Sequence, residues 1–239
     1  MKKGFRPRHK GFHPQPSVPP TYLSLVKMIE KSGITLTEPQ FKRLWDYHNW
    51  LRNRNEDREL TRIINFEAVV VKHYIDCLIV GDLYPLPSPL MDLGSGAGFP
   101  GIPLKIRYPE IEMVLAEPRP KKVAFLNEVI ERLHLKGIKV FDHKVVSQSF
   151  TEPMAGVISR AVEEIPKTLL RCQGCSDKGT KIIFMKGPNA DEEIKEAQAR
   201  VGNIYSLVLD KAYSLPGTSH DRRLIVYERI TPREEVSLG

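Results

Sequence analysis

The sequence predicts an α/β protein with a mostly parallel, seven-stranded sheet that is preceded by a small helical subdomain. From residue 90 onward, short apolar runs alternate with amphipathic stretches, which is typical of strands joined by helices. The last two strand-like runs are joined only by a loop with proline and glycine, so we expect an antiparallel closing strand. Before residue 85 the apolar residues show helical spacing alone.

Three helices are expected in the region before the sheet. The first begins near Tyr22 and ends before Gly33. Thr37 is suited to cap the second, whose apolar residues recur at three- and four-residue spacing as far as Leu51. The third is expected over residues 66–80. A rigid connector follows, with prolines at Pro85, Pro87 and Pro89.

The alternating region yields seven strands and four helices. The strands are expected over residues 90–93, 111–116, 138–141, 156–159, 181–185, 204–209 and 223–229. The helices are expected over residues 100–107, 120–135, 163–171 and 190–201. Strands and helices that alternate at this spacing predict a parallel sheet with helices on both faces. The resulting domain boundaries are a disordered tail over 1–20, helices over 21–84, the sheet domain over 85–232 and a C-terminal tail over 233–239.

The net charge of +7 lies mostly at the N-terminus. Residues 1–20 contain five basic residues and no acidic one: Lys2, Lys3, Arg6, Arg8 and Lys10. The other 219 residues therefore carry only +2, as 7 − 5 = 2. A basic, proline-rich arm either binds phosphate groups or keeps the protein soluble, and the composition does not choose between these roles.

Cysteine content and hydropathy predict a cytoplasmic protein. Three cysteines do not make a disulfide framework, and they suit a reducing compartment. No apolar run approaches the roughly 18 residues that a membrane helix requires. We therefore expect no association with a membrane.

A glycine-rich loop follows the first expected strand. Gly94, Gly96 and Gly98 lie between the strand over 90–93 and a helix that begins near Pro100. Glycine allows positive φ and lets a ligand approach the backbone closely. The carboxyl edge of a parallel strand is also where doubly wound sheets bind ligands. The loop is therefore the expected cofactor site.

Two cofactors are compatible with this loop. The pattern G-x-G-x-x-G over residues 96–101 matches the dinucleotide fingerprint, whereas G-x-G-x-G over 94–98, preceded by Asp92, matches loops that bind S-adenosylmethionine. Glu117 ends the next strand and would accept the two ribose hydroxyls of either cofactor. Asp92, the antiparallel closing pair and the lack of a second domain favour S-adenosylmethionine.

Residues 92–104 resemble the signature of the bacterial glucose-inhibited division protein B family, and the extension Phe99-Pro-Gly-Ile-Pro103 is its most diagnostic part. Further similarities are Lys72-His73-Tyr-Ile-Asp76, Lys121-Lys122-Val-x-Phe125-Leu126, Ile158-Ser159-Arg160-Ala161 and Lys186-Gly187. The resemblance implies a Rossmann-like, S-adenosylmethionine-dependent methyltransferase that modifies a guanine N7 in 16S ribosomal RNA. The implied partner is that RNA or the small ribosomal subunit, with no obligate protein partner.

The resemblance also assigns roles to residues. Gly94 and Phe99 would line the cofactor pocket, Val145 and Val146 would lie beside the adenine, and Arg160 would lie in the cleft. This sequence departs from the family pattern at three positions. They are Val146 where glutamate is common, Glu59 in place of the asparagine of Asn-Leu-Thr, and Arg223 where histidine is common.

The expected chemistry needs positioning and no general base, because guanine N7 has a free lone pair and no proton to lose. Arg160 and Lys186, at the ends of two strands, are the candidates for positioning the base or its phosphate. Weaker candidates for RNA contact are His73, Arg222, Arg223 and the basic residues of the tail. The pair Cys172-x-x-Cys175 does not complete a metal site, so none is expected.

Two other functions remain open at this stage. One is a nicotinamide-dependent oxidoreductase that uses the same loop. The other is a non-catalytic ribosome-assembly factor that retains the fold.

Overall fold

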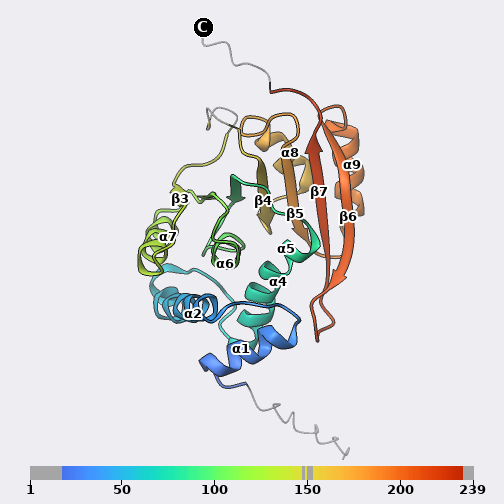
Figure 1. Cartoon of the computed structure of the whole chain (residues 1–239). Coiled ribbons are helices and arrows are strands. Elements are labelled where there is room, and N and C mark those ends of the chain that lie inside the picture. The colour runs from blue at the N-terminus through green and yellow to red at the C-terminus, as the bar shows by residue number, and fades with distance from the viewer. Residues whose placement is uncertain (1–17, 147–148, 150–152, 234–239) are drawn as a thin grey trace, which may run out of the picture.

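The computed structural model describes residues 18–146, 149 and 153–233, which form one seven-stranded sheet flanked by helices (Figure 1). The strand order is β3-β2-β1-β4-β5-β7-β6. The strands are β1 Leu90–Leu93, β2 Met113–Ala116, β3 Ile138–Phe141, β4 Gly156–Arg160, β5 Lys181–Lys186, β6 Tyr205–Ser214 and β7 Asp221–Arg229.

The expected strand directions are confirmed. Strands β1 to β5 pair in parallel, whereas β7 lies antiparallel between β5 and β6. The hairpin of β6 and β7 is longer than predicted, because pairing continues to Ser214 and Asp221. Residues of this extension are mostly exposed or half-buried, so they lack the apolar alternation by which a strand is recognised.

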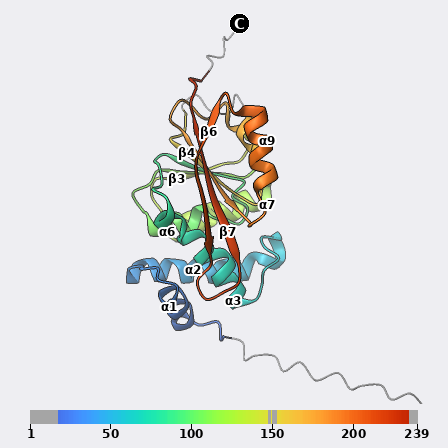
Figure 2. The same ribbon diagram turned by 90° about the vertical axis from the view of Figure 1, so that its right-hand side faces the viewer.

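Helices cover both faces of the sheet, and each face has its own hydrophobic core. The helices of the sheet region are α6 Gly101–Arg107, α7 Pro120–Arg132, α8 Ile165–Cys172 and α9 Asp191–Val201. One core joins α6 and α7 to side chains such as Leu90, and the other joins α8 and α9 to side chains such as Met91. Neighbouring strand residues thus enter opposite cores, as the pleat requires. Figure 2 shows α6 and α9 on opposite sides of the sheet.

The N-terminal region is helical, as expected. Its elements are α1 Tyr22–Lys31, α2 Glu38–Arg58, α3 Phe66–Val69, a π-helix η1 Val70–Ile75, α4 Asp76–Leu78 and α5 Val80–Leu83. The N–H of Thr37 donates to Gln40 Oε1 at 2.8 Å, half of a capping box that fixes the start of α2. These helices share the α6–α7 core, and the expected domain boundaries stay predictions.

The third predicted helix contains a π-helical segment. The Asp76 N–H donates to the carbonyls of Val71 and His73, and not to the carbonyl of Lys72, which would be its partner in an α-helix. The Lys72 carbonyl instead accepts a hydrogen bond from Arg160 Nη1 at 2.8 Å. Single π-helical turns are frequent at functional sites. This one frees a backbone acceptor for a side chain at the end of β4.

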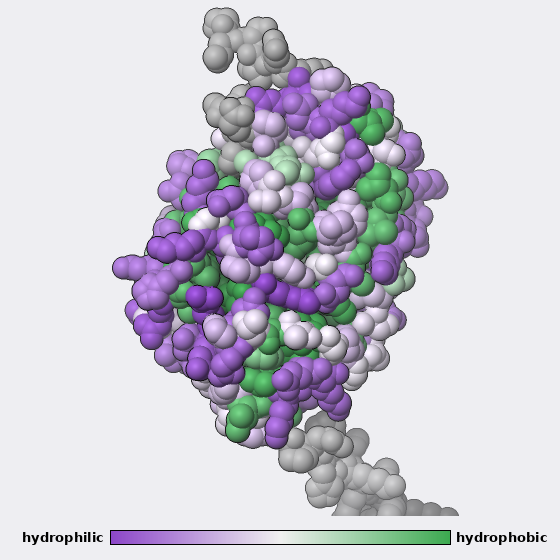
Figure 3. Space-filling view, viewed as in Figure 1, coloured by the Kyte–Doolittle hydropathy of each residue, from purple (hydrophilic) through white to green (hydrophobic). Residues whose placement is uncertain are grey.

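The helical region covers the carboxyl ends of the parallel strands. In Figure 1 the arrowhead of β4 points toward these helices, and that of β7 points away from them. On the face shown in Figure 3, hydrophobic and hydrophilic surface are interleaved. Among the described residues, no helix combines the length and the apolar character needed to cross a bilayer.

Candidate functional site

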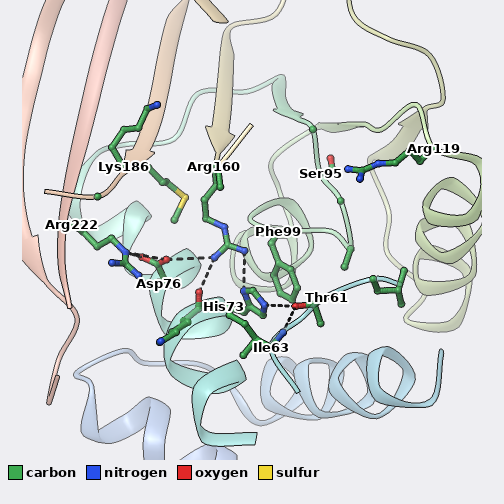
Figure 4. Close-up of a pocket in the computed structure, with 18 residues that line it drawn as sticks. Thr61, Ile63, His73, Asp76, Ser95, Phe99, Arg119, Arg160, Lys186 and Arg222 are labelled. Carbon is green, nitrogen blue, oxygen red and sulfur yellow. Dashed lines mark hydrogen bonds and ion pairs between the residues drawn. The ribbon is translucent and has the colours of Figure 1, made fainter. Parts of the chain in front are cut away.

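A cavity of about 460 Å³ lies where the carboxyl ends of β1, β4 and β5 meet the N-terminal helices (Figure 4). The lining from the sheet side includes Gly94, Ser95, Gly96, Ala97, Phe99, Arg119, Arg160, Met185 and Lys186. The lining from the helical side includes Leu60, Thr61, Ile63, Lys72, His73 and Asp76, and Arg222 is added from β7. The cavity therefore joins the predicted cofactor loop to the predicted positioning residues.

The glycine loop has the backbone geometry that its sequence predicts. The φ angles of Gly94, Gly96 and Gly98 are +75°, +60° and +102°. A Cβ at Gly98 would meet Ile102 Cγ1 at 2.5 Å, so glycine is required there by packing. A Cβ at Gly96 would meet no described protein atom nearer than 3.9 Å. The space beside Gly96 is thus open to a ligand.

The carboxylate of Asp92 helps to hold the glycine loop in place. Its Oδ2 accepts the Gly101 N–H at 2.9 Å, which holds the first turn of α6 beneath the glycines. Its Oδ1 is buried without a hydrogen-bond partner among the described residues. Burial raises the pKa of Asp92 to about 7, although the Gly101 N–H opposes that shift. Asp92 does not line the cavity, and direct contact with a cofactor stays a prediction.

Glu117 is fully buried at the end of β2 and faces the same loop. Its Oε2 accepts the Gly96 N–H at 2.9 Å. Its Oε1 accepts both the backbone N–H and the side-chain Nε–H of Arg119, at 3.0 and 2.9 Å. The Arg119 side chain is 65% exposed, so a ligand can displace it at little cost and reach the carboxylate.

Arg160 lies at the centre of the cavity and is held by several groups (Figure 4). Nη1 donates to the Lys72 carbonyl at 2.8 Å and lies 3.5 Å from Asp76 Oδ2. Nη2 lies 3.0 Å from His73 Nδ1, and the guanidinium carbon lies 5.3 Å from the Phe99 ring centroid. These contacts fix the orientation of the guanidinium before any substrate binds.

His73 is a buried, neutral ring. Burial and the neighbouring Arg160 lower the pKa of His73 to about 3. The ring stacks on Phe99 with 4.3 Å between centroids, and its Nε2 lies 3.0 Å from Thr61 Oγ1. His73 is therefore held between Thr61 and Arg160, and its contact with RNA stays a prediction.

Two other cationic side chains of the cavity, Arg222 and Lys186, are paired with carboxylates. Arg222 Nε lies 3.2 Å from Asp76 Oδ1, so Asp76 serves two arginines. Lys186 Nζ lies 2.7 Å from Glu193 Oε2 and donates to the Glu163 carbonyl at 3.0 Å. In the described part of the chain, Asp76 is the one acidic side chain that lines the cavity, whereas the basic side chains there are Lys72, Arg119, Arg160, Lys186 and Arg222. The charged side chains of the cavity are therefore mostly cationic.

The cavity includes some of the predicted site residues and leaves others outside its lining. Those that line it are His73, Gly94, Gly96, Phe99, Arg160, Lys186 and Arg222. Those that do not are Asp92, Gly98, Glu117, Val145, Val146 and Arg223. Arg223 is bound to Asp191 and Asp210, which hold its pKa above the usual range. The basic residues of the tail lie outside the described residues.

Arg119, Thr61 and Met185 are among the lining residues that sequence reasoning did not predict. Arg119 lies two residues after Glu117, a spacing that could have indicated the hydrogen bond between their side chains. Thr61 was noted only as part of a departure from the family pattern, and Met185 only as the end of a strand. Only the fold shows that these side chains line one cavity.

Within residues 18–146, 149 and 153–233, no group of three or more His, Cys, Asp and Glu side chains could hold a metal ion. Cys172, the last residue of α8, and Cys175 are buried free thiols in the core that contains α8 and α9.

Comparison with known protein sequences gives a consistent result. A model of the family described as rRNA small subunit methyltransferase G matches residues 40–217. A ribosomal RNA small subunit methyltransferase G 2 of Syntrophobacter fumaroxidans is 48% identical over 86% of this chain, which spans 41% of that protein. A protein of the same name in Bdellovibrio bacteriovorus is 39% identical, with 86% of this chain and 81% of that protein covered. A ribosomal RNA small subunit methyltransferase G of Lachnoclostridium phytofermentans is 33% identical, over 90% and 93%.

Solved structures support the fold. The glycopeptide N-methyltransferase MtfA, complexed with sinefungin, has a TM-score of 0.53 at 10% identity, with 67% of this chain and 94% of that chain covered. Ribosomal protein L11 methylase of Lactobacillus delbrueckii subsp. bulgaricus has a TM-score of 0.51 at 11% identity, over 70% and 81%. With its glycine loop, buried carboxylates and matching sequence, the chain belongs to the rRNA small subunit methyltransferase G family.

Proposed function

We propose that this protein transfers a methyl group from S-adenosylmethionine to the N7 of a guanine in 16S ribosomal RNA. The observation that carries the proposal is one cavity that joins a family-specific glycine loop to a cationic cluster centred on Arg160. Family membership and the names of the relatives, all ribosomal RNA small subunit methyltransferases G, support the substrate class.

The cofactor fits beside the glycine loop. Gly94, Gly96 and Gly98 would form the close-approach surface, supported by Asp92, and Glu117 would accept the ribose hydroxyls after displacement of Arg119. Phe99 and Arg160 line the same space, and Val145 and Val146 are proposed to lie beside the adenine. When bound, the cofactor supplies a methyl group on a positively charged sulfur.

The protein's contribution to the reaction is positioning. Guanine N7 needs no deprotonation, so no residue has to act as a general base. Holding two reactants in line can supply about 7–11 kcal/mol of the barrier. Arg160 has the rigidity that this task requires, because a backbone carbonyl, a carboxylate and an imidazole hold its guanidinium. Arg160 and Lys186 are proposed to position the base or its phosphate.

The cationic lining suits an RNA substrate. Arg119, Lys186 and Arg222 are each partly exposed, and their carboxylate partners can be exchanged for phosphate oxygens. The target guanine must be unpaired or extruded to enter the cavity. We propose that 16S RNA or the small subunit suffices as partner, that the protein works in the cytoplasm without a membrane, and that the basic tail adds phosphate contacts.

Neither alternative function is supported. The antiparallel β7 between β5 and β6 differs from the wholly parallel order 3-2-1-4-5-6 of dinucleotide-binding folds, which argues against a nicotinamide-dependent oxidoreductase. No observation favours a non-catalytic assembly factor over an enzyme.

The test is incorporation of a labelled methyl group from S-adenosylmethionine. Small subunits that lack the modification and protein-free 16S RNA are compared as substrates, with an Arg160→Lys variant as the control for the site. We expect label in RNA with the wild-type protein and a strong loss with the variant. Cofactor binding without label in either substrate would refute the proposed substrate, and tight binding of reduced nicotinamide cofactor alone would refute the proposed chemistry.

A further inference from the structure

We infer that the hydroxyl of Thr61 is a hydrogen-bond donor to the O6 carbonyl oxygen of the target guanine, and that it helps the enzyme to distinguish guanine from other purines. The inference rests on the proposed function and adds a residue that determines substrate specificity. It follows from the hydrogen bonds that converge on one side chain at the wall of the cavity (Figure 4).

The tautomer of His73 is set by Arg160. A guanidinium has donors and no acceptor, so His73 Nδ1, 3.0 Å from Arg160 Nη2, must present its lone pair. The ring is neutral, because the pKa of His73 is lowered to about 3 by burial and by Arg160. Its one N–H is therefore on Nε2, which lies 3.0 Å from Thr61 Oγ1. In this pair, His73 donates and Thr61 accepts.

Thr61 Oγ1 accepts a second hydrogen bond. The backbone N–H of Ile63 donates to it at 3.1 Å. Because a hydroxyl oxygen has two lone pairs, both are now occupied. The remaining tetrahedral direction belongs to the hydroxyl hydrogen, and no described residue accepts it. The result is a donor with a fixed direction on a residue that lines the cavity.

The backbone of Thr61 is also held. The side-chain amide of Asn55 on α2 accepts from the Thr61 N–H at 2.8 Å and donates to the Thr61 carbonyl at 3.0 Å. Both the backbone and the side chain of Thr61 are therefore in place before RNA binds. Four hydrogen bonds to one threonine are hard to explain by fold stability alone, since the residue is only half-buried.

The chemistry of the base identifies the acceptor. Guanine presents N7 and O6, both acceptors, on the same edge, whereas adenine presents an amino donor in place of O6. When N7 faces the methyl donor, O6 lies next to it on the cavity wall. A fixed hydroxyl donor there stabilises guanine and opposes adenine. A site that hydrogen-bonds one substrate group rejects analogues that lack that group, because its own donor is left unpaired.

The experiment is a double-mutant cycle between protein and RNA. The modified guanosine is first mapped with the wild-type protein, and 16S RNA is then ligated with guanosine or 2-aminopurine at that position. The analogue retains N7 and lacks O6. Single-turnover methylation is measured for the wild type, Thr61→Val and Thr61→Ser, with S-adenosylmethionine affinity measured by calorimetry for each.

We expect the wild type to prefer guanosine over 2-aminopurine, and Thr61→Val to lose roughly 2- to 12-fold of that preference, the range for one neutral hydrogen bond. Thr61→Ser should retain the wild-type preference, and cofactor affinity should stay unchanged. A Thr61→Val protein that slows equally on both RNAs would show a structural role only and overturn the inference. A wild-type protein that methylates no guanosine would instead refute the proposed function.

Discussion

Gly96 offers a direct test of where the cofactor binds, because its substitution separates binding from folding. The glycine has φ +60°, and an added Cβ would meet only Gly94 O and Lys122 Nζ, both at 3.9 Å. The protein itself therefore leaves room for a methyl group. Only a bound ligand would occupy that space.

The expected cost to stability of Gly96→Ala is small. An L-residue in the left-handed region costs roughly 1–2 kcal/mol, partly offset by about 0.4–1 kcal/mol from the stiffer unfolded chain. Gly33→Ala is a matched control, since Gly33 has φ +81° and a Cβ there would meet no described atom within 4 Å. Gly33 follows α1 and does not line the cavity. Both variants should lose about 1 kcal/mol of unfolding free energy.

The expected cost to binding differs between the two. A methyl group forced into a filled site costs about 1–3 kcal/mol, so Gly96→Ala should bind S-adenosylmethionine about 5- to 150-fold more weakly. Gly33→Ala should bind it like the wild type. Urea denaturation gives the stabilities and titration calorimetry gives the affinities. Unchanged affinity in Gly96→Ala would refute the placement of the cofactor beside this loop.

Three further predictions concern stability. Asp76→Asn leaves Arg160 and Arg222 without their shared carboxylate and should cost on the order of 2–3 kcal/mol by urea denaturation. Glu196→Gln breaks a pair with Arg200 in which both side chains are exposed and should cost under about 1 kcal/mol, and equal losses would contradict the burial argument. Burial lowers the pKa of His48 from 6.5 to about 4, so the stability that neutral His48 contributes is present above pH 6.5 and is lost as pH falls toward 4. His48→Asn should therefore reduce the slope of unfolding free energy against pH in that window by up to about 1.4 kcal/mol per pH unit, and an unchanged slope would show that His48 does not titrate there. Glu59 caps the end of α2 with φ 49°, a left-handed conformation that glycine adopts without strain. Glu59→Gly should therefore raise the unfolding free energy by up to about 1 kcal/mol, and a lower melting temperature in thermal denaturation would show that the Glu59 side chain is needed.

The sheet and the glycine loop were predictable because each depends on residues that are close in sequence. The strand over 90–93, the loop that follows and the acidic end of β2 form one contiguous pattern, and the structure places Gly96 against Glu117 as that pattern implies. The hairpin beyond residue 209 was underestimated, since its outer half is stabilised by pairing between strands and buries few apolar side chains.

The cluster around Arg160 was only partly predictable. Arg160 and His73 are separated by 87 positions, and the π-helical turn that frees the Lys72 carbonyl leaves little trace in the helical periodicity. Thr61 has no distinguishing pattern of its own, because its role depends on which atoms surround it and not on its neighbours in sequence. Such contacts between distant segments require the three-dimensional structure.

The central claim is that the product is an N7-methylated guanine in 16S RNA. It is tested most directly by nucleoside mass spectrometry of small subunits incubated with the protein and S-adenosylmethionine that carries a deuterated methyl group. We expect the heavy label in 7-methylguanosine, at one position of the RNA. Heavy label in another methylated nucleoside, or none in RNA despite cofactor binding, would contradict it.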